Sequence, residues 1–196
     1  MRSNAVARLQ RGTQSATGEV FDHELYDTIV LATATTQHLL FVTGLGQGAT
    51  PKTLELTNFE GSGVMPQGQR LRVNAVTAQY LGKKAGATAD VDYLYDLLAT
   101  TTVTIEIQGK QYIYRKPLAR ILGLPILKQF TPTAAGDNLL ISSFGTGRGI
   151  DRLQIPITLA ALSQFKVYVE LWTAANTALD GDRIRIGLAG VMERLS

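Results

Sequence analysis

The chain of 196 residues is poor in charge: 45% of its residues are hydrophobic, 18% are charged, and the formal net charge is +3. Globular proteins average about 25% charged residues. A chain of this length can bury a substantial core without covalent help. The sequence contains no cysteine, which excludes disulfides, thiolate metal sites and cysteine nucleophiles. The small net charge argues against nucleic acid as the main ligand.

Low charge, combined with many threonine, alanine and glycine residues, indicates that part of the surface is covered by other protein. Stable protein interfaces are depleted in charged residues at their centres. We therefore expect a homo-oligomer or a subunit of a larger shell. The alternative is a soluble monomer with a threonine-rich β surface.

Residues 1–18 are predicted to form an extended N-terminal arm outside the domain. Arg2, Arg8 and Arg11 all precede the first acidic residue, Glu19. Such arms can contact phosphates or an acidic neighbour, and more often they are solvated termini. The arm lacks a signal-peptide core, and no run in the chain approaches the roughly 18 apolar residues of a membrane span. We expect synthesis in a cytoplasm and no membrane partner.

Alternation of apolar and polar residues, or a short apolar run, predicts the first strands of the chain. The clearest alternation covers residues 70–80, where Leu71, Val73, Ala75 and Thr77 share the drier face. Two shorter strands are predicted before it, over residues 38–43 and 53–57.

One short helix and a hairpin are predicted next. Residues 90–100 place apolar side chains at helical spacing, and Asp90 can cap the first turn. Residues 102–108 and 111–115 alternate on either side of Gly109-Lys110. A glycine in the first position of a two-residue loop is typical of a type II′ turn.

The rest of the chain adds four predicted strands, over residues 138–142, 152–158, 165–172 and 183–191. Asp180-Gly181 marks the turn before the last of them, and residues 117–125 form a helical turn or an irregular segment. Because no helix alternates with the strands, residues 19–196 are predicted to form one mainly β domain. The expected architecture is a sandwich or jelly roll of about eight strands.

No motif selects a catalytic, metal or cofactor site. The glycines at 44–48 are not followed by a helix, and those at 145–149 lack the Lys-Ser/Thr of a phosphate loop. The two histidines do not cluster. We predict no enzyme activity, no cofactor, no metal and no small-molecule substrate, although a carboxylate pair in a cleft is an alternative that sequence leaves open.

Three residues are predicted to form interface contacts besides the N-terminal arginines. Arg148 lies in the second glycine-rich segment. Tyr112 and Tyr114 share one face of the second hairpin strand. Tyrosine is favoured at subunit interfaces and on sugar-stacking surfaces alike, so this face indicates either a protein contact or carbohydrate binding.

A succession of segments resembles bacteriophage virion proteins of the jelly-roll type. It comprises Met65-Pro66-Gln67-Gly68 before the strand over residues 69–73, then residues 90–99, the hairpin ending in Lys110-Gln111-Tyr112, and Pro117-Leu118. The resemblance covers residues 59–125, about a third of the chain, and is a pattern of segments more than a motif.

The resemblance implies a capsid subunit, or a decoration (cement) protein that binds a capsid surface, often as a trimer. It implies assembly with other capsid proteins, residence in the virion and no catalytic residues. The alternative prediction is a β-sandwich binding module for carbohydrate or receptor recognition.

Overall fold

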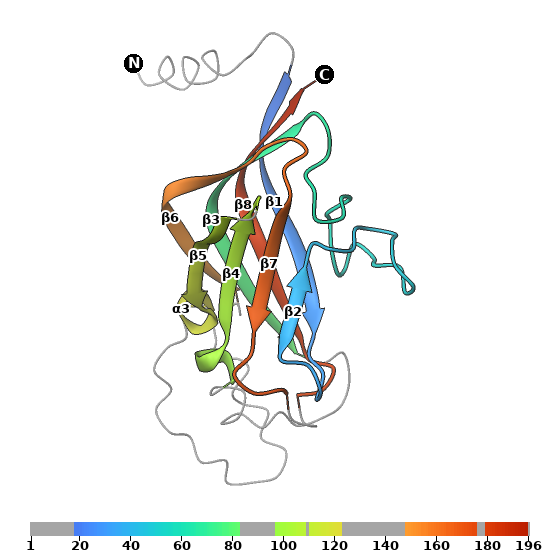
Figure 1. The fold of residues 1–196 in the computed structure, drawn as a ribbon, viewed down its shortest axis with the longest axis vertical. Coiled ribbons are helices and arrows are strands. Elements are labelled where there is room, and N and C mark those ends of the chain that lie inside the picture. The colour runs from blue at the N-terminus through green and yellow to red at the C-terminus, as the bar shows by residue number, and fades with distance from the viewer. Residues whose placement is uncertain (1–17, 83–96, 109, 123–147, 176–178, 196) are drawn as a thin grey trace, which may run out of the picture.

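Two four-stranded antiparallel sheets face each other in the computed structural model (Figure 1). The model describes residues 18–82, 97–108, 110–122, 148–175 and 179–195. The first sheet has the order β1 (Gly18–Val30), β8 (Arg183–Leu195), β3 (Gln69–Gly82) and β6 (Arg148–Leu159). The second has the order β2 (Gln37–Leu40), β7 (Phe165–Glu170), β4 (Thr102–Ile107) and β5 (Lys110–Pro117). The prediction of a mainly β chain is confirmed.

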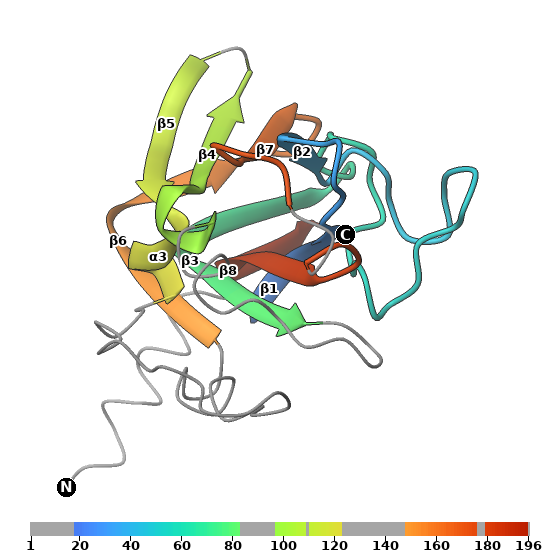
Figure 2. The same cartoon turned by 90° about the horizontal axis from the view of Figure 1, so that it is seen from below.

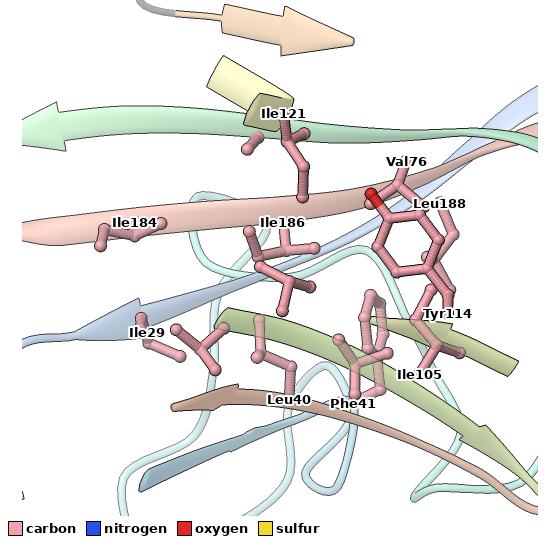
Figure 3. Packing of buried hydrophobic residues seen from close by; sticks show 14 of the residues in the cluster. Ile29, Leu40, Phe41, Val76, Ile105, Tyr114, Ile121, Ile184, Ile186 and Leu188 are labelled. Carbon is pink, nitrogen blue, oxygen red and sulfur yellow. The ribbon is translucent and has the colours of Figure 1, made fainter. Parts of the chain in front are cut away.

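The core fills the space between the sheets. Three phenylalanines, Phe41, Phe59 and Phe165, form its most aromatic part, with ring centroids 5.4–5.7 Å apart. Edge-to-face contacts at this spacing add to the stabilisation from burial. Figure 3 shows the aliphatic part, in which side chains of β8 face those of the other sheet: Ile184, Ile186 and Leu188 against Leu40 and Ile105.

A β-bulge in β3 corrects the predicted face of that strand. Leu71 and Val73 point into the core as expected, but the register shifts between Val73 and Ala75. Beyond the shift, Val76 and Ala78 are the core residues. An extra residue on one strand reverses the side-chain alternation, and sequence alternation alone does not locate it.

The strand β1 was not among the predicted elements. Its inward positions are Leu25, Asp27 and Ile29, all buried. The carboxylate in the middle interrupts the apolar pattern that reveals a strand. The predicted strand over residues 38–43 is shorter than expected and ends at Leu40, because Phe41 has a φ of 63°.

The predicted strand over residues 53–57 is wrong. This segment is a turn, in which the carbonyl of Thr53 accepts hydrogen bonds from the N–H groups of Leu56 and Thr57. Leu54, which alternation placed on a buried face, is 62% exposed. The turn belongs to the connection between β2 and β3.

This connection closes the outer edge of β1. The side-chain carbonyl of Asn58 accepts a hydrogen bond from the N–H of Tyr26 at 2.8 Å, and its amide donates to the carbonyl of Glu24 at 2.7 Å. Asn58 therefore satisfies the edge at Glu24 and Tyr26 as a neighbouring strand would, which removes a template for unwanted pairing at that point.

The predicted hairpin is present with its loop displaced. Ile107 pairs with Lys110, so the loop begins at Gln108, which has a φ of 49°, and not at Gly109. The predicted helix is described only at residues 97–100, which are helical. The predicted strand 138–142 and the arm up to residue 17 lie outside the described residues, and Gly18 already belongs to β1.

A second short helix, α3 (Leu118–Leu122), follows β5 where sequence indicated a helical turn or an irregular segment. Figure 2 shows it beside β5 and β6, and its Leu118 and Ile121 are buried. Gly149 of β6 permits this close approach, because a Cβ there would lie 1.8 Å from the carbonyl oxygen of Ile121.

We predict that Gly149→Ala destabilises the domain by about 1–3 kcal/mol or more, because backbone has to move to admit the methyl group. The measurement is urea-induced unfolding. The control is Ile150→Ala at the next position, whose exposed side chain should change stability by less than about 0.5 kcal/mol. Equal effects of the two substitutions would contradict the packing of α3 described above.

Candidate functional site

Most of the residues predicted to form contacts lie outside what the structure describes. This applies to Arg2, Arg8 and Arg11 entirely, and to the side chains of Tyr112 in β5 and Arg148 at the start of β6. The strand positions of the last two place them on the same side of the sandwich, since β5 and β6 both flank α3.

Tyr114 is a core residue, which corrects its predicted position at an exposed interface. It is 5% exposed, and its hydroxyl donates to Oδ2 of Asp151 at 2.9 Å. Lys116 Nζ donates to the same oxygen at 2.5 Å. The cluster joins β5 of one sheet to β6 of the other, so its function is to connect the two sheets.

The charges of this cluster are coupled. Burial alone would raise the pKa of Asp151, but the hydrogen bonds from Lys116 and Tyr114 and the positive charges of Lys116 and Arg120 hold it below its ordinary value. Burial and the bond to Asp151 raise the pKa of Tyr114. Tyr114 therefore stays a neutral donor and Asp151 a charged acceptor.

A buried carboxylate, Asp27, fastens the β2–β3 connection to β1. Lys52 Nζ lies 2.7 Å and 2.8 Å from its two oxygens. The N–H of Phe41 donates to Oδ2 at 2.6 Å, and the N–H of Thr28 donates to Oδ1 at 2.9 Å. With no exposed surface and four hydrogen bonds from three donor groups, Asp27 has a structural role and no free oxygen to offer a substrate.

A second buried carboxylate, that of Asp182, also accepts a hydrogen bond. The hydroxyl of Tyr80 donates to Asp182. Burial is the main cause that raises the pKa of Tyr80, and this hydrogen bond is the second. Asp27, Asp151 and Asp182 each sit in a separate cluster. In the described part of the chain no three His, Asp or Glu side chains are arranged to hold a metal ion.

The two histidines lie in different sheets, His23 on β1 and His38 on β2. Burial, together with the charge of Arg194, lowers the pKa of His23, while Glu24 opposes the shift. Burial lowers the pKa of His38. Both imidazoles are therefore predominantly neutral at pH 7, and neither contacts a nucleophile among the hydrogen bonds that the structure records.

The glycine-rich segment 44–48 forms a turn and no nucleotide loop. Gly46 and Gly48 have φ angles of 72° and 95°. Within residues 18–82 no helix follows that could direct its amides at a phosphate, as dinucleotide sites require. Here the glycines shape the connection that covers β1.

An open hollow of about 490 Å³ lies where the two sheets part beside the β4–β5 loop. Its wall is the segment of β6 around Ile155 and Pro156, which interrupts pairing with β3 between residues 152 and 157. The lining is mostly apolar: Ile107, Leu153, Ile155, Pro156 and Ile157, with Gln108 and Thr158. A second, shallower hollow of about 400 Å³ lies on the outer face of the first sheet, over Ala75 and Ala189.

Several large apolar side chains project from the surface, and one of them, Ile155, lines the first hollow. Ile155 at the β6 irregularity and Trp172 after β7 are each 83% exposed. Sequence reasoning missed Ile155, because its alternation with Leu153 and Ile157 predicts an inward position. The signal was Pro156, since proline in a strand marks an edge or a bulge. Leu162 and Ile150 are also exposed.

Comparisons with known proteins leave the chain without an assigned family. No family model matches the sequence, and no curated protein is significantly similar to it. A chain in the acidic stable capsid structure of Helicobacter pylori bacteriophage KHP30 matches with a TM-score of 0.34 and 9% identity, over 91% of this chain and 93% of that one.

None of the helical segments in the described ranges has the length and hydrophobicity of a membrane span.

We predict that Lys52→Met costs about 3–5 kcal/mol of stability, because it leaves the buried Asp27 charge without its counter-ion. Adding Asp27→Asn should recover part of that loss, so the double variant is more stable than the sum of the single effects implies. Urea unfolding measures both, with the exposed Lys166→Met as control. A Lys52→Met variant as stable as the parent would refute the assignment.

The Asp151 cluster predicts a pH dependence. A carboxylate whose pKa is lowered on folding adds stability above its ordinary pKa of about 3.9, and this stability is lost as the pH falls through the folded value. Lys116→Met removes the main stabilising donor, so the variant should be less stable at pH 6 and should lose less on acidification. Urea unfolding between pH 6 and pH 2 tests this, and an unchanged acid slope would count against it.

Proposed function

We propose that the domain is a jelly roll. The proposal rests on strand pairing: β1 pairs with β8, β2 with β7, β3 with β6, and β4 with β5. A long hairpin of eight strands rolled up on itself gives these four pairs. Rolling also brings β3 beside β8 and β4 beside β7, and both neighbours are present.

We further propose that the chain is a structural subunit of a bacteriophage virion, either in the capsid shell or as a decoration protein upon it. It acts by assembly with copies of itself and with other capsid proteins, and not by catalysis. The observation that carries the proposal is the exposure of large apolar side chains, above all Ile155, on a sandwich whose two buried carboxylates in the described residues, Asp27 and Asp182, both have structural partners. Exposed apolar surface of this kind is typical of protein contacts.

Two further features support assembly. Only 18% of the residues are charged, as in chains whose surface is partly covered by neighbours. The segments over residues 59–125 resemble jelly-roll virion proteins. The described parts of that resemblance include β3 of the first sheet and the β4–β5 hairpin of the second.

Trp172 favours the second candidate, a β-sandwich module for carbohydrate or receptor binding. An exposed indole stacks well on a sugar ring. Sugar-binding platforms generally use more than one aromatic ring. Tyr168 lies on the preceding strand, β7, and its hydroxyl is hydrogen-bonded to Glu106. A glycan array showing saturable binding that Trp172→Ala removes would establish this candidate.

The test of the leading proposal is assembly in solution. Size-exclusion chromatography with light scattering should show that the chain alone forms an oligomer, or that it binds to capsids of the source phage when the two are incubated together. Ile155→Arg should shift the population toward monomer while changing the unfolding free energy by less than about 0.5 kcal/mol, because the side chain touches little of its own core.

Val42→Arg provides the control, because Val42 is another exposed apolar residue, located in the connection after β2. A wild-type chain that stays monomeric at all concentrations and binds no capsid would overturn the proposed function.

A further inference from the structure

The two most exposed large apolar side chains of the described residues stand in unlike surroundings. Ile155 and Trp172 are each 83% exposed. Ile155 lines the open hollow of about 490 Å³ beside the β4–β5 loop, which we call the recess. Trp172 instead projects from the surface after the end of β7. The chain therefore presents both an apolar recess and an apolar protrusion.

The recess is a product of the backbone of β6. Four residues of this strand, 153–156, stand opposite the single residue Asn74 of β3, because Arg152 pairs with Ala75 and Ile157 with Val73. Surplus residues in one strand are left unpaired and bend it. Pro156, which has no N–H to donate, lies in this stretch. The recess therefore does not depend on the rotation of one side chain.

The protrusion is fixed by the alternation of β7. Val167, Val169 and Leu171 are buried, so that Trp172 falls on the outward side. The N–H of Leu171 donates to the carbonyl of Thr36 at 2.7 Å, which continues the pairing beyond the last residue of the strand. The indole is thus carried outward by paired backbone and not by a free loop.

The recess has the chemistry that an indole requires. An indole has a large apolar body and one N–H, which usually finds an acceptor when it is buried. The apolar lining includes Ile107, Leu153 and Pro156, while Gln108 and Thr158 add side-chain oxygens that can accept a hydrogen bond. A volume of about 490 Å³ lies within the range of small-ligand pockets, about 300–1,000 Å³, and so admits an indole.

The recess and the protrusion of one molecule cannot meet. Ile107 pairs with Phe165 at the start of β7, whereas Trp172 follows the other end of that strand. At the rise of a β-strand the two ends lie roughly 20 Å apart. Figure 1 shows β7 running from the β4–β5 loop toward the end of the sandwich at which α3 lies. An indole that enters the recess must come from another copy.

We propose that Trp172 of one copy inserts into the recess of a second copy, beside Ile155. This inference rests on the proposed assembly function and names the partner of Ile155 in it. Tryptophan is enriched among the residues that dominate binding energy, and such residues fill pockets at the centre of an interface. Because recess and protrusion differ, the contact is heterologous, and its repetition produces rings or extended arrays and no closed twofold dimer.

The experiment uses tryptophan fluorescence, because Trp172 is the only tryptophan in the sequence. The emission of the whole chain is recorded over a concentration series, with light scattering on the same samples. As the wild type assembles, we expect the emission maximum to move to shorter wavelength and quenching by iodide to fall, since the indole leaves water.

Two variants assign the contact. Trp172→Ala should weaken assembly by more than about tenfold, the loss typical of a hot-spot residue. Ile155→Arg should abolish the concentration-dependent shift of the Trp172 emission. The two residues lie at opposite ends of one molecule, so this effect has to act between copies. Both side chains are exposed, and circular dichroism with thermal melting verifies the fold of each variant.

Mixing the two variants tests the insertion directly. Ile155→Arg retains the protrusion and Trp172→Ala retains the recess, so an equimolar mixture should form heterodimers in which the emission shifts. Growth should stop there, because the heterodimer has neither a second usable recess nor a second indole. Leu54→Arg is the control, since Leu54 is 62% exposed in the β2–β3 connection, and this variant should assemble as the wild type does.

The outcomes separate this inference from the proposed function. If the wild type assembles with unchanged emission, or if Trp172→Ala assembles as well as the wild type, the insertion is wrong and the assembly function stands. Assembly blocked by Ile155→Arg alone would give the recess a different occupant. A wild type that binds capsids but stays monomeric would also refute the contact between copies. One that neither assembles nor binds capsids would defeat the proposed function itself.

Discussion

Two sheets that face each other leave four edge strands, and the treatment of those edges governs the rest of this structure. At β1 the β2–β3 connection supplies Asn58 as a substitute partner, and the buried Asp27–Lys52 pair holds the connection in place. At β6, Pro156 and the projecting Ile155 interrupt regular pairing. One edge is thus closed by the chain's own residues, and the other is kept irregular, so that neither invites indiscriminate sheet extension.

Most of the fold followed from residue alternation, because the core faces of β4, β7 and β8 are uninterrupted. The failures have local causes. The strand β1 was not predicted because Asp27 places a charged residue on its inward face. That charge can be buried because Lys52, which is distant in sequence, forms an ion pair with it. Residues 53–57 alternate by chance on a turn. The bulge after Val73 reverses the faces of β3, and only the partner strands reveal where it lies.

The candidate surfaces were harder to predict than the strands. Tyr114 looked like a contact residue, yet its hydroxyl meets Asp151 on a strand of the other sheet, a pairing that sequence does not disclose.

The position of β8 has a consequence for biosynthesis. This strand follows all the others in the chain, yet it sits between β1 and β3, and its pairing joins Gly18 to Leu195. During translation β1 therefore cannot form its pairing with β8 until β8 has left the ribosome. Pairing between strands so far apart in sequence is slow. The first sheet is therefore complete only at that moment.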